Sequence, residues 1–439
     1  MSEQWSITAE SSSNPTVFPR DGARGRKVNQ VSERHIENID WAYLMGEVEE
    51  LVSAIEDAEG RTATLHAAVQ AIISRFRDQL GIYGGRIFRR QGDQYVLLGV
   101  FGDAQPAPEG LVLPESYPPI QAVLDRRTIF MEADDPQVDR DVEDDLGVQR
   151  FAAIEVGDQD YILAFDIAPG RLRTGVLYSL GILRSAINMR FRQARLDDVL
   201  MEARRIQASI FPRRSPRFPG FDVFGRSQPM EIVGGDHFDF IELSDAFLGV
   251  AIADVSGHGL PAALLVRDVH IGLRMGLSKE FKITHTLERL NAIIHRSRLT
   301  SRFVSMFYCE IEPRGTLTYV NAGHPPPIFI AASGEHCSLM AGGAVLGPLA
   351  EVTYQRGFAT LNRGDLCVLF TDGIIEAPGS EQDAAVEEFG VERLIDVVRE
   401  HREESAEEIV QAVFRGAEEF SGNDSLNDDR TVVVIKRVD

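Results

Sequence analysis

Four segments in the second half of the chain place an aspartate directly beside a short apolar run. They are VGGDHFDF around Asp236, IADVSGHG around Asp254, LFTDGIIEA around Asp372 and NDDRT around Asp428. Each aspartate is predicted to lie where a strand enters or leaves a sheet, and strand ends are where a rigid scaffold presents functional side chains. The fold must therefore either gather these carboxylates at one sheet edge or leave them dispersed in turns.

Taken singly, each segment is typical of an ordinary turn or a solvated loop. Gathered together, the carboxylates would repel one another, and their pKa values would be pushed apart, unless cations neutralise them. Oxygen ligands without a cysteine motif or a histidine pair at helical spacing favour magnesium or manganese. An excess of carboxylates suggests two ions that share one ligand, and such pairs hydrolyse phosphate esters.

The first half of the chain has a different pattern. Residues 1–35 are rich in Ser, Pro and Gly and show no apolar periodicity, which predicts a disordered arm. Residues 36–192 begin with helical spacing and continue with alternating apolar runs broken by QGDQ, PAPEG and VGDQD turns. This order predicts a helical lead-in followed by an antiparallel sheet with hairpins and flanking helices.

An apolar stripe joins the two halves over about Val176 to Phe211. Its members at 3,4 spacing are Leu196, Val199, Ala203, Ile206 and Ile210, and the stripe extends back to Met189 and Ile182. Arg192 and Ser185 interrupt it, and Pro212 ends the helix. The pattern fits a helix packed on its own domain, or a parallel two-stranded coiled coil that joins two domains in a homodimer. We expect a linker helix over 193–212 and a second domain over 213–439.

The second domain has an α+β pattern. Strand-like runs alternate with two helices that begin near Pro261 and Thr284, and the chain closes with TVVVIKRV. The sequence contains neither GxGxxG nor GxxxxGK[ST], so nucleotide binding of those two kinds is not expected.

Composition narrows the possible partners and location. The chain has 45 basic and 67 acidic residues, a net charge of −22, which disfavours binding to nucleic acid or to an anionic membrane surface. Neither a signal peptide nor a membrane span is visible. The three cysteines are far apart, as in a reducing compartment, and a cytoplasmic location is expected.

Seven motifs of the second half occur together in one order. They are AR-x-IQ-x-x-x-x-P (Ala203 to Pro212), GGD-x-x-D (Gly234 to Asp239), D-V-S-G-H-G (Asp254 to Gly259), NAGHPP (from Asn321), TDG-x-x-EA (Thr371 to Ala377), FG-x-ERL (Phe389 to Leu394) and DD-x-T (Asp428 to Thr431). Over residues 203–437 this set resembles the SpoIIE/RsbU-like branch of the PPM protein serine/threonine phosphatases. The resemblance implies a β-sandwich flanked by helices and two Mn²⁺ or Mg²⁺ ions that activate water. It also implies a phosphorylated STAS-domain protein, an anti-sigma-factor antagonist in bacterial partner switching, as substrate.

The resemblance also assigns roles to individual residues. It implies that Asp254 bridges both metals, that Asp236 is a ligand on one side, and that Asp372 and Asp428 are ligands on the other, with the backbone carbonyl of Val255 as a further ligand.

Three more residues have less defined roles. Asp239 occupies a matching place without an assigned role as a ligand. Asp429 stands where related phosphatases can carry asparagine, and His258 is either a general acid or a helix cap.

Residues of about 60–192 resemble a GAF domain in the order of their elements. This implies either a sensor of a small-molecule or protein signal, or a dimerisation module without a ligand. Two other classes of function remain possible from the sequence: a catalytically silent scaffold with the phosphatase fold, and a ligand receptor that acts through protein binding. All four aspartates of the proposed metal site are present, which argues against the silent scaffold.

Overall fold

The computed structural model describes residues 60–439 except 109, 133, 172, 245, 278–281, 298–301, 380–386 and 423–425, together with residues 46, 49, 53 and 55. The predicted disordered arm over 1–35 and most of the helical lead-in lie outside the described residues. The chain divides into two compact units, Met1–Phe191 and Arg192–Asp439. Within the described part of the chain, no helix is both long and apolar enough to cross a membrane.

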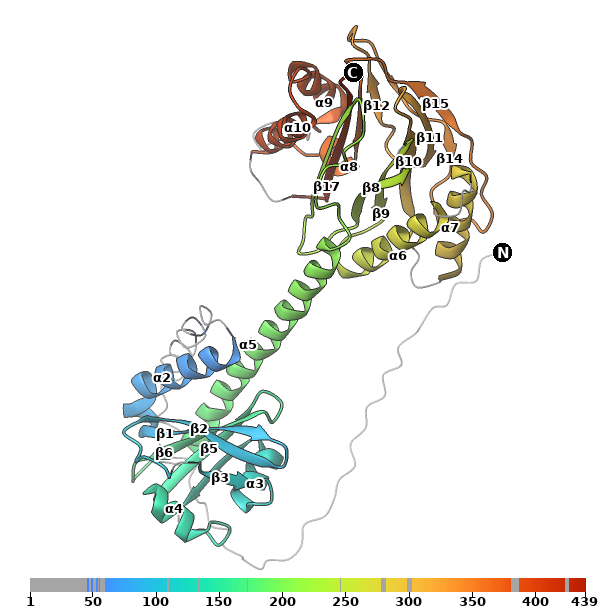
Figure 1. Ribbon diagram of the computed structural model, residues 1–439. Helices are drawn as coiled ribbons and strands as arrows, with labels where there is room; N and C mark the ends of the chain where they lie inside the picture. Colours follow the sequence, from blue (N-terminus) through green and yellow to red (C-terminus); the bar gives the residue numbers. More distant parts are fainter. Residues whose placement is uncertain are drawn as a thin grey trace, which may run out of the picture. The chain divides into compact units, whose positions relative to one another are not determined.

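The first unit is built on a six-stranded antiparallel sheet with the order β3-β2-β1-β6-β5-β4 (Figure 1). The strands are β1 (Ile82–Gln91), β2 (Gln94–Gly102), β3 (Val112–Pro114), β4 (Thr128–Glu132), β5 (Arg150–Val156) and β6 (Tyr161–Ile167). Helix α2 (Arg61–Leu80) and the first half of α5 (Arg173–Ala208) share an apolar cluster with one face of this sheet. Helices α3 (Pro118–Arg126) and α4 (Arg140–Leu146) share a second cluster with the other face. The prediction of an antiparallel sheet between helices is confirmed.

A fully buried ion pair lies in this sheet. Arg86 on β1 donates to both carboxylate oxygens of Asp166 on β6, at 3.0 and 3.2 Å, and its other terminal nitrogen donates to the carbonyls of Gln105 and Leu146. The two side chains are only 2% and 4% exposed. Arg86 therefore fixes the loop at Gln105 and the end of α4 to the sheet centre, and both charges of the pair are almost completely removed from water.

The second unit contains two sheets. One has the order β14-β11-β10-β9-β8, with β15 also paired to β11, and the other has the order β13-β12-β16-β17-β7. Their strands are β7 (Phe221–Gln228), β8 (Asp236–Ser244), β9 (Phe247–Val255), β10 (Val304–Ile311), β11 (Thr316–Ala322), β12 (Ile328–Ile330), β13 (His336–Ser338), β14 (Gly342–Gly343), β15 (Gly357–Thr360), β16 (Leu366–Phe370) and β17 (Arg430–Arg437).

The two sheets pack face to face and are covered by helices on both outer sides (Figure 1). Helices α6 (Gly259–Leu277) and α7 (Ile283–Ser297) share an apolar cluster with the first sheet. Helices α8 (Asp372–Ile375), α9 (Gly390–Glu400) and α10 (Ala406–Phe420) share another with the second. The predicted β-sandwich flanked by helices is confirmed.

The linker stripe is part of a single helix, α5, which ends at Ala208 and not at Phe211. Its first half buries Leu180, Leu183 and Ile187 in the first unit. The stripe residues Met189, Leu196, Val199 and Ile206 are exposed, by 58, 64, 54 and 45%. The prediction was wrong for Ile210, which lies beyond the helix end and packs against the cluster of α6 and α7. A turn follows the helix end, and in it the backbone N–H of Ile210 donates to the carbonyl of Gln207.

We predict that Asp166→Ala lowers the free energy of unfolding of the first unit by about 3 to 5 kcal/mol, because it leaves the buried Arg86 charge without its carboxylate partner. Asp160→Ala is the matched control, since it removes an ion pair to Arg61 whose side chains are 45% and 50% exposed and should cost less than about 1 kcal/mol. Urea unfolding followed by circular dichroism measures both. Equal losses for the two variants would contradict this account of the buried pair.

Candidate metal centre

The first pair of aspartates is brought together by strand register. Strands β8 and β9 form an antiparallel hairpin in which Asp236 lies directly opposite Asp254. On its other side Asp254 faces Ser305 of β10. Two aspartates that are 18 positions apart in the sequence therefore meet at one end of the first sheet, because the connecting turn and the side-chain alternation fix the register.

The second pair comes from the other sheet. Asp372 is the first residue of α8, directly after β16 and Thr371, and Asp428 lies just before β17. Strands β16 and β17 are antiparallel neighbours, with Phe370 opposite Val432. The end of one strand therefore lies beside the start of the next, which places Asp372 and Asp428 at one edge.

Two threonines connect the sheets at this point. The hydroxyls of Thr371 and Thr431 both donate to Oδ2 of Asp236, at 2.8 and 2.6 Å. The backbone N–H of Thr431 also donates to the Thr371 hydroxyl, at 2.9 Å. These bonds cross from the second sheet to the first, so the four aspartates lie at the same end of the sandwich.

The carboxylates influence one another strongly. Burial, together with the charges of Asp372, Asp428 and Asp429, raises the pKa of Asp254 to about 7. Burial also raises the pKa of Asp236 and of Asp372, with added contributions from Asp254 and from Asp428 respectively. Buried carboxylates that destabilise one another's ionised form are an oxygen-only donor set for which hard divalent cations are the natural counter-charge.

Glycines allow the loops to converge on this site. A Cβ on Gly235 would lie 2.7 Å from the carbonyl oxygen of Val255, and a Cβ on Gly373 would lie 2.1 Å from that of Asp429. Any other residue at these positions would push the backbone apart. Close backbone packing therefore explains the glycines of the GGD and TDG motifs. Gly235 also allows the Val255 carbonyl to lie beside the loop that leads to Asp236.

Asp429 and Asp239 have roles that differ from those of the four aspartates. Asp429 accepts hydrogen bonds from the backbone N–H groups of Met230 and Gly235 and so holds the loop before Asp236. Asp239 lies on the other face of β8, where Arg274 donates to both of its oxygens at 2.8 Å. The structure thus places Asp429 beside the cluster and Asp239 outside it.

Neighbouring loops are fixed by contacts that the sequence did not reveal. Nδ1 of His258 lies 2.6 Å from a carboxylate oxygen of Glu231, and both side chains are exposed. Arg302 donates to the carbonyl of Ser256 at 2.6 Å. Thr371 and Thr431 belong to the TDG and DD-x-T motifs, and this was the only indication in the sequence that they contribute to the site. Nothing in the sequence indicated a role for Glu231 or Arg302.

The NAGHPP segment forms a rigid turn. The side chain of Asn321 accepts from the N–H of His324 at 2.8 Å and donates to its carbonyl at 3.0 Å. The imidazole of His324 lies 2.9 Å from the hydroxyl of Ser305, the residue opposite Asp254. This turn therefore supports β10 behind the candidate metal centre and adds no ligand of its own.

Known proteins resemble the second unit. A family model described as Stage II sporulation protein E (SpoIIE) matches residues 244–438. The chain is 27% identical over 237 residues to the phosphoserine phosphatase RsbU of Bacillus subtilis, covering 54% of this chain and 69% of that protein. It is also 27% identical over 154 residues to the phosphoserine phosphatase RsbP of the same organism, covering 34% of this chain and 38% of that protein.

A solved structure shows the same fold. The SiaA-PP2C domain of Pseudomonas aeruginosa superposes with a TM-score of 0.50 at 23% identity, covering 56% of this chain and 99% of that domain. The matched family model, the two relatives and the shared fold agree with the motif order in the sequence. The second unit of this chain therefore carries a SpoIIE-type domain over residues 244–438 and has the PP2C fold.

Proposed function

We propose that this chain removes phosphate from a phosphoserine or phosphothreonine of a STAS-type protein in bacterial partner switching, under control of its first unit. The observation that carries the proposal is the convergence of Asp236, Asp254, Asp372 and Asp428 at one end of the sandwich. The names of the relatives RsbU and RsbP support the phosphoserine specificity.

The donor set suggests which residues would hold each metal ion. Two Mg²⁺ or Mn²⁺ ions, when bound, would lower the pKa of a water molecule and neutralise charge on the phosphoryl oxygens. Asp254, which faces Asp236 in the sheet and is influenced by Asp372 and Asp428, is the residue suited to bridge the ions. Val255 would add its carbonyl, and Asp372 and Asp428 would hold the second ion.

The supporting residues hold these ligands in place and offset part of the rise in the pKa of Asp236 that burial causes. Thr371 and Thr431 donate to one oxygen of Asp236, which favours its carboxylate form and fixes its orientation. A protein nucleophile is not required. The buried thiols of Cys309 and Cys367 are unsuited to that task, because burial raises the pKa of each.

The substrate class can be tested directly. We expect manganese-dependent phosphate release from a phosphorylated STAS-domain protein, with little turnover of free nucleotides, because the sequence has no glycine loop that would hold a nucleotide phosphate. Efficient hydrolysis of nucleotides with none of the phosphoprotein would contradict the proposal. If the full-length protein were inactive on both, the alternative of a silent scaffold or receptor would be favoured.

We predict that Asp254→Ala and Asp372→Ala each lower manganese-dependent activity by more than about 100-fold, since loss of a metal ligand should cost more than loss of a group that only orients one. Both variants should fold, because each also removes repulsion from the cluster. Asp268→Ala, which removes an exposed carboxylate from α6, is the control and should keep full activity. Near-normal turnover by Asp254→Ala in saturating manganese would refute the ligand assignment.

The linker helix provides a route of control. Gln207, near the end of α5, donates to the carbonyl of Gly234 at 2.6 Å and accepts from its N–H at 3.2 Å. Gly234 is two residues before Asp236, so the helix end contacts the loop that carries a proposed ligand. The exposed stripe of Met189, Leu196, Val199 and Ile206 repeats at heptad spacing and favours pairing with a second copy in a parallel homodimer.

We predict that the double variant Leu196→Asp, Val199→Asp weakens dimerisation and changes the activity of the full-length enzyme without loss of its metals. The reason is that two charges in the stripe oppose helix pairing, while both residues lie far along the helix from Gln207. Asp198→Ala, on another face, is the control. Light scattering and phosphatase assays measure the two effects; a monomeric wild type at micromolar concentration would exclude the paired helix.

A further inference from the structure

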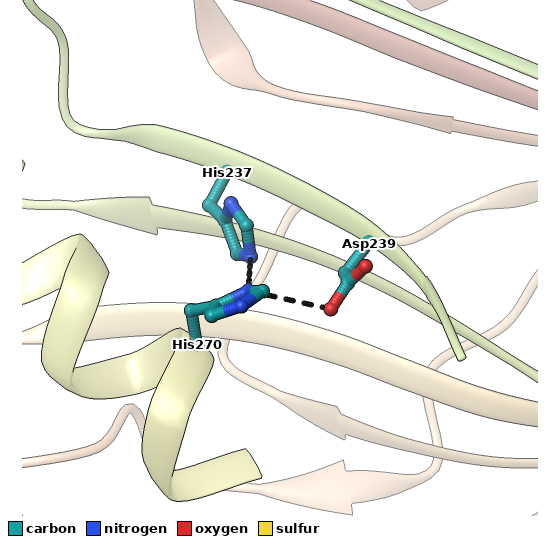
Figure 2. A group of neighbouring side chains, drawn as sticks. All are labelled: His237, Asp239 and His270. Carbon is teal, nitrogen blue, oxygen red and sulfur yellow. Dashed lines mark hydrogen bonds and ion pairs between the residues drawn. The ribbon is translucent and has the colours of Figure 1, made fainter. Parts of the chain in front are cut away.

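Three side chains that could bind a metal gather on the face of β8 that is covered by α6. His237 and Asp239 alternate with Asp236 along the strand, so they lie on the opposite face from it. His270 comes from α6, and in Figure 2 dashed lines join its ring to both of the other side chains. None of these three residues has a part in the metal centre described above.

Two distances within this group match the ligand separations of a metal site. Nδ1 of His270 lies 3.3 Å from Nε2 of His237 and 3.4 Å from Oδ2 of Asp239. One ligand atom from each residue can be chosen so that all three lie within 4.8 Å of one another. A tetrahedral zinc site with bonds near 2.0 to 2.1 Å has ligand atoms about 3.3 to 3.4 Å apart.

Hydrogen bonds among these three side chains do not give every nitrogen and oxygen atom a suitable partner. A single N–H on His270 Nδ1 would lie between two acceptors, one on His237 and one on Asp239. If His237 instead donated from Nε2, the lone pairs of His270 and Asp239 would face each other at 3.4 Å. In either arrangement Nδ1 of His237 is buried without a hydrogen-bond partner among the described residues. One cation could accept a lone pair from each of the three residues.

The surroundings prepare the group for a cation. Arg274 donates to both oxygens of Asp239, which orients the carboxylate, and a ligating carboxylate commonly has such a partner. His237 is fully buried, and Nε2 of its ring faces Nδ1 of His270. The side chain of His270 is 15% exposed, which leaves a side from which a water could complete the coordination.

We infer that His237, Asp239 and His270 form a zinc site that is separate from the proposed di-metal centre. Two imidazoles and one carboxylate favour zinc over magnesium or manganese, whereas the catalytic cluster offers oxygen alone. A zinc ion here would join α6 to β8. Since α6 begins at Gly259, shortly after Asp254, and β8 begins at Asp236, the ion would fix two elements that present proposed catalytic ligands.

The test is zinc binding by the full-length protein in excess magnesium, measured by equilibrium dialysis and metal analysis. One zinc ion per chain should remain in the wild type and in Asp254→Ala, which disables the other centre. The variants His237→Phe and His270→Gln should lower zinc affinity by more than about 100-fold. His285→Gln removes an exposed histidine from α7 and is the control.

Cobalt provides a second readout that does not depend on activity. The wild type loaded with Co²⁺ should show the intense visible absorption of a four-coordinate ion, and His270→Gln, whose side chain is at the site's open edge, should lose it while keeping the native circular dichroism spectrum. Zinc binding that disappears in Asp254→Ala, or that is unchanged in both His270→Gln and His237→Phe, would overturn the inference. Absence of zinc binding by the wild type would overturn it as well.

Discussion

The second unit depends on one unfavourable interaction, the repulsion among carboxylates that the fold forces together at the end of two sheets. Burial and neighbouring charges raise the pKa of Asp254 to about 7, which means that its ionised form is destabilised in the protein without cations. A fold keeps such a cluster only where other contacts hold it. Here the hydroxyls of Thr371 and Thr431 and the backbone contacts of Asp429 supply those contacts.

The same end of the sandwich also receives contacts from the end of the linker helix. The loop before Asp236 is bonded to Asp429 from the second sheet and to Gln207 from the linker helix. Because both partners hold the short GGD loop, a shift of the helix end would move the backbone beside a proposed ligand. A control signal would need to supply only the free-energy difference between two positions of this loop.

The sequence predicted those parts of the site that follow from strand alternation and short motifs. Asp236, Asp254, Asp372 and Asp428 each adjoin an apolar run, and strand ends converge in a sandwich. The sequence could not reveal pairings set by tertiary packing. Arg302 meets Ser256 across 46 positions, and His270 meets His237 across 33, without a motif that includes both members. Ile210 was assigned to the linker stripe because 3,4 spacing continues past the residue at which the helix ends.

The central claim is that the four aspartates of the sandwich end bind a pair of hard cations that share Asp254. Anomalous X-ray diffraction from crystals grown with manganese tests it most directly. The account predicts two manganese peaks among Asp236, Asp254, Asp372 and Asp428, with Asp254 coordinating both. Well-ordered aspartates at saturating manganese with no peak between them, or with manganese bound elsewhere in the unit, would contradict it.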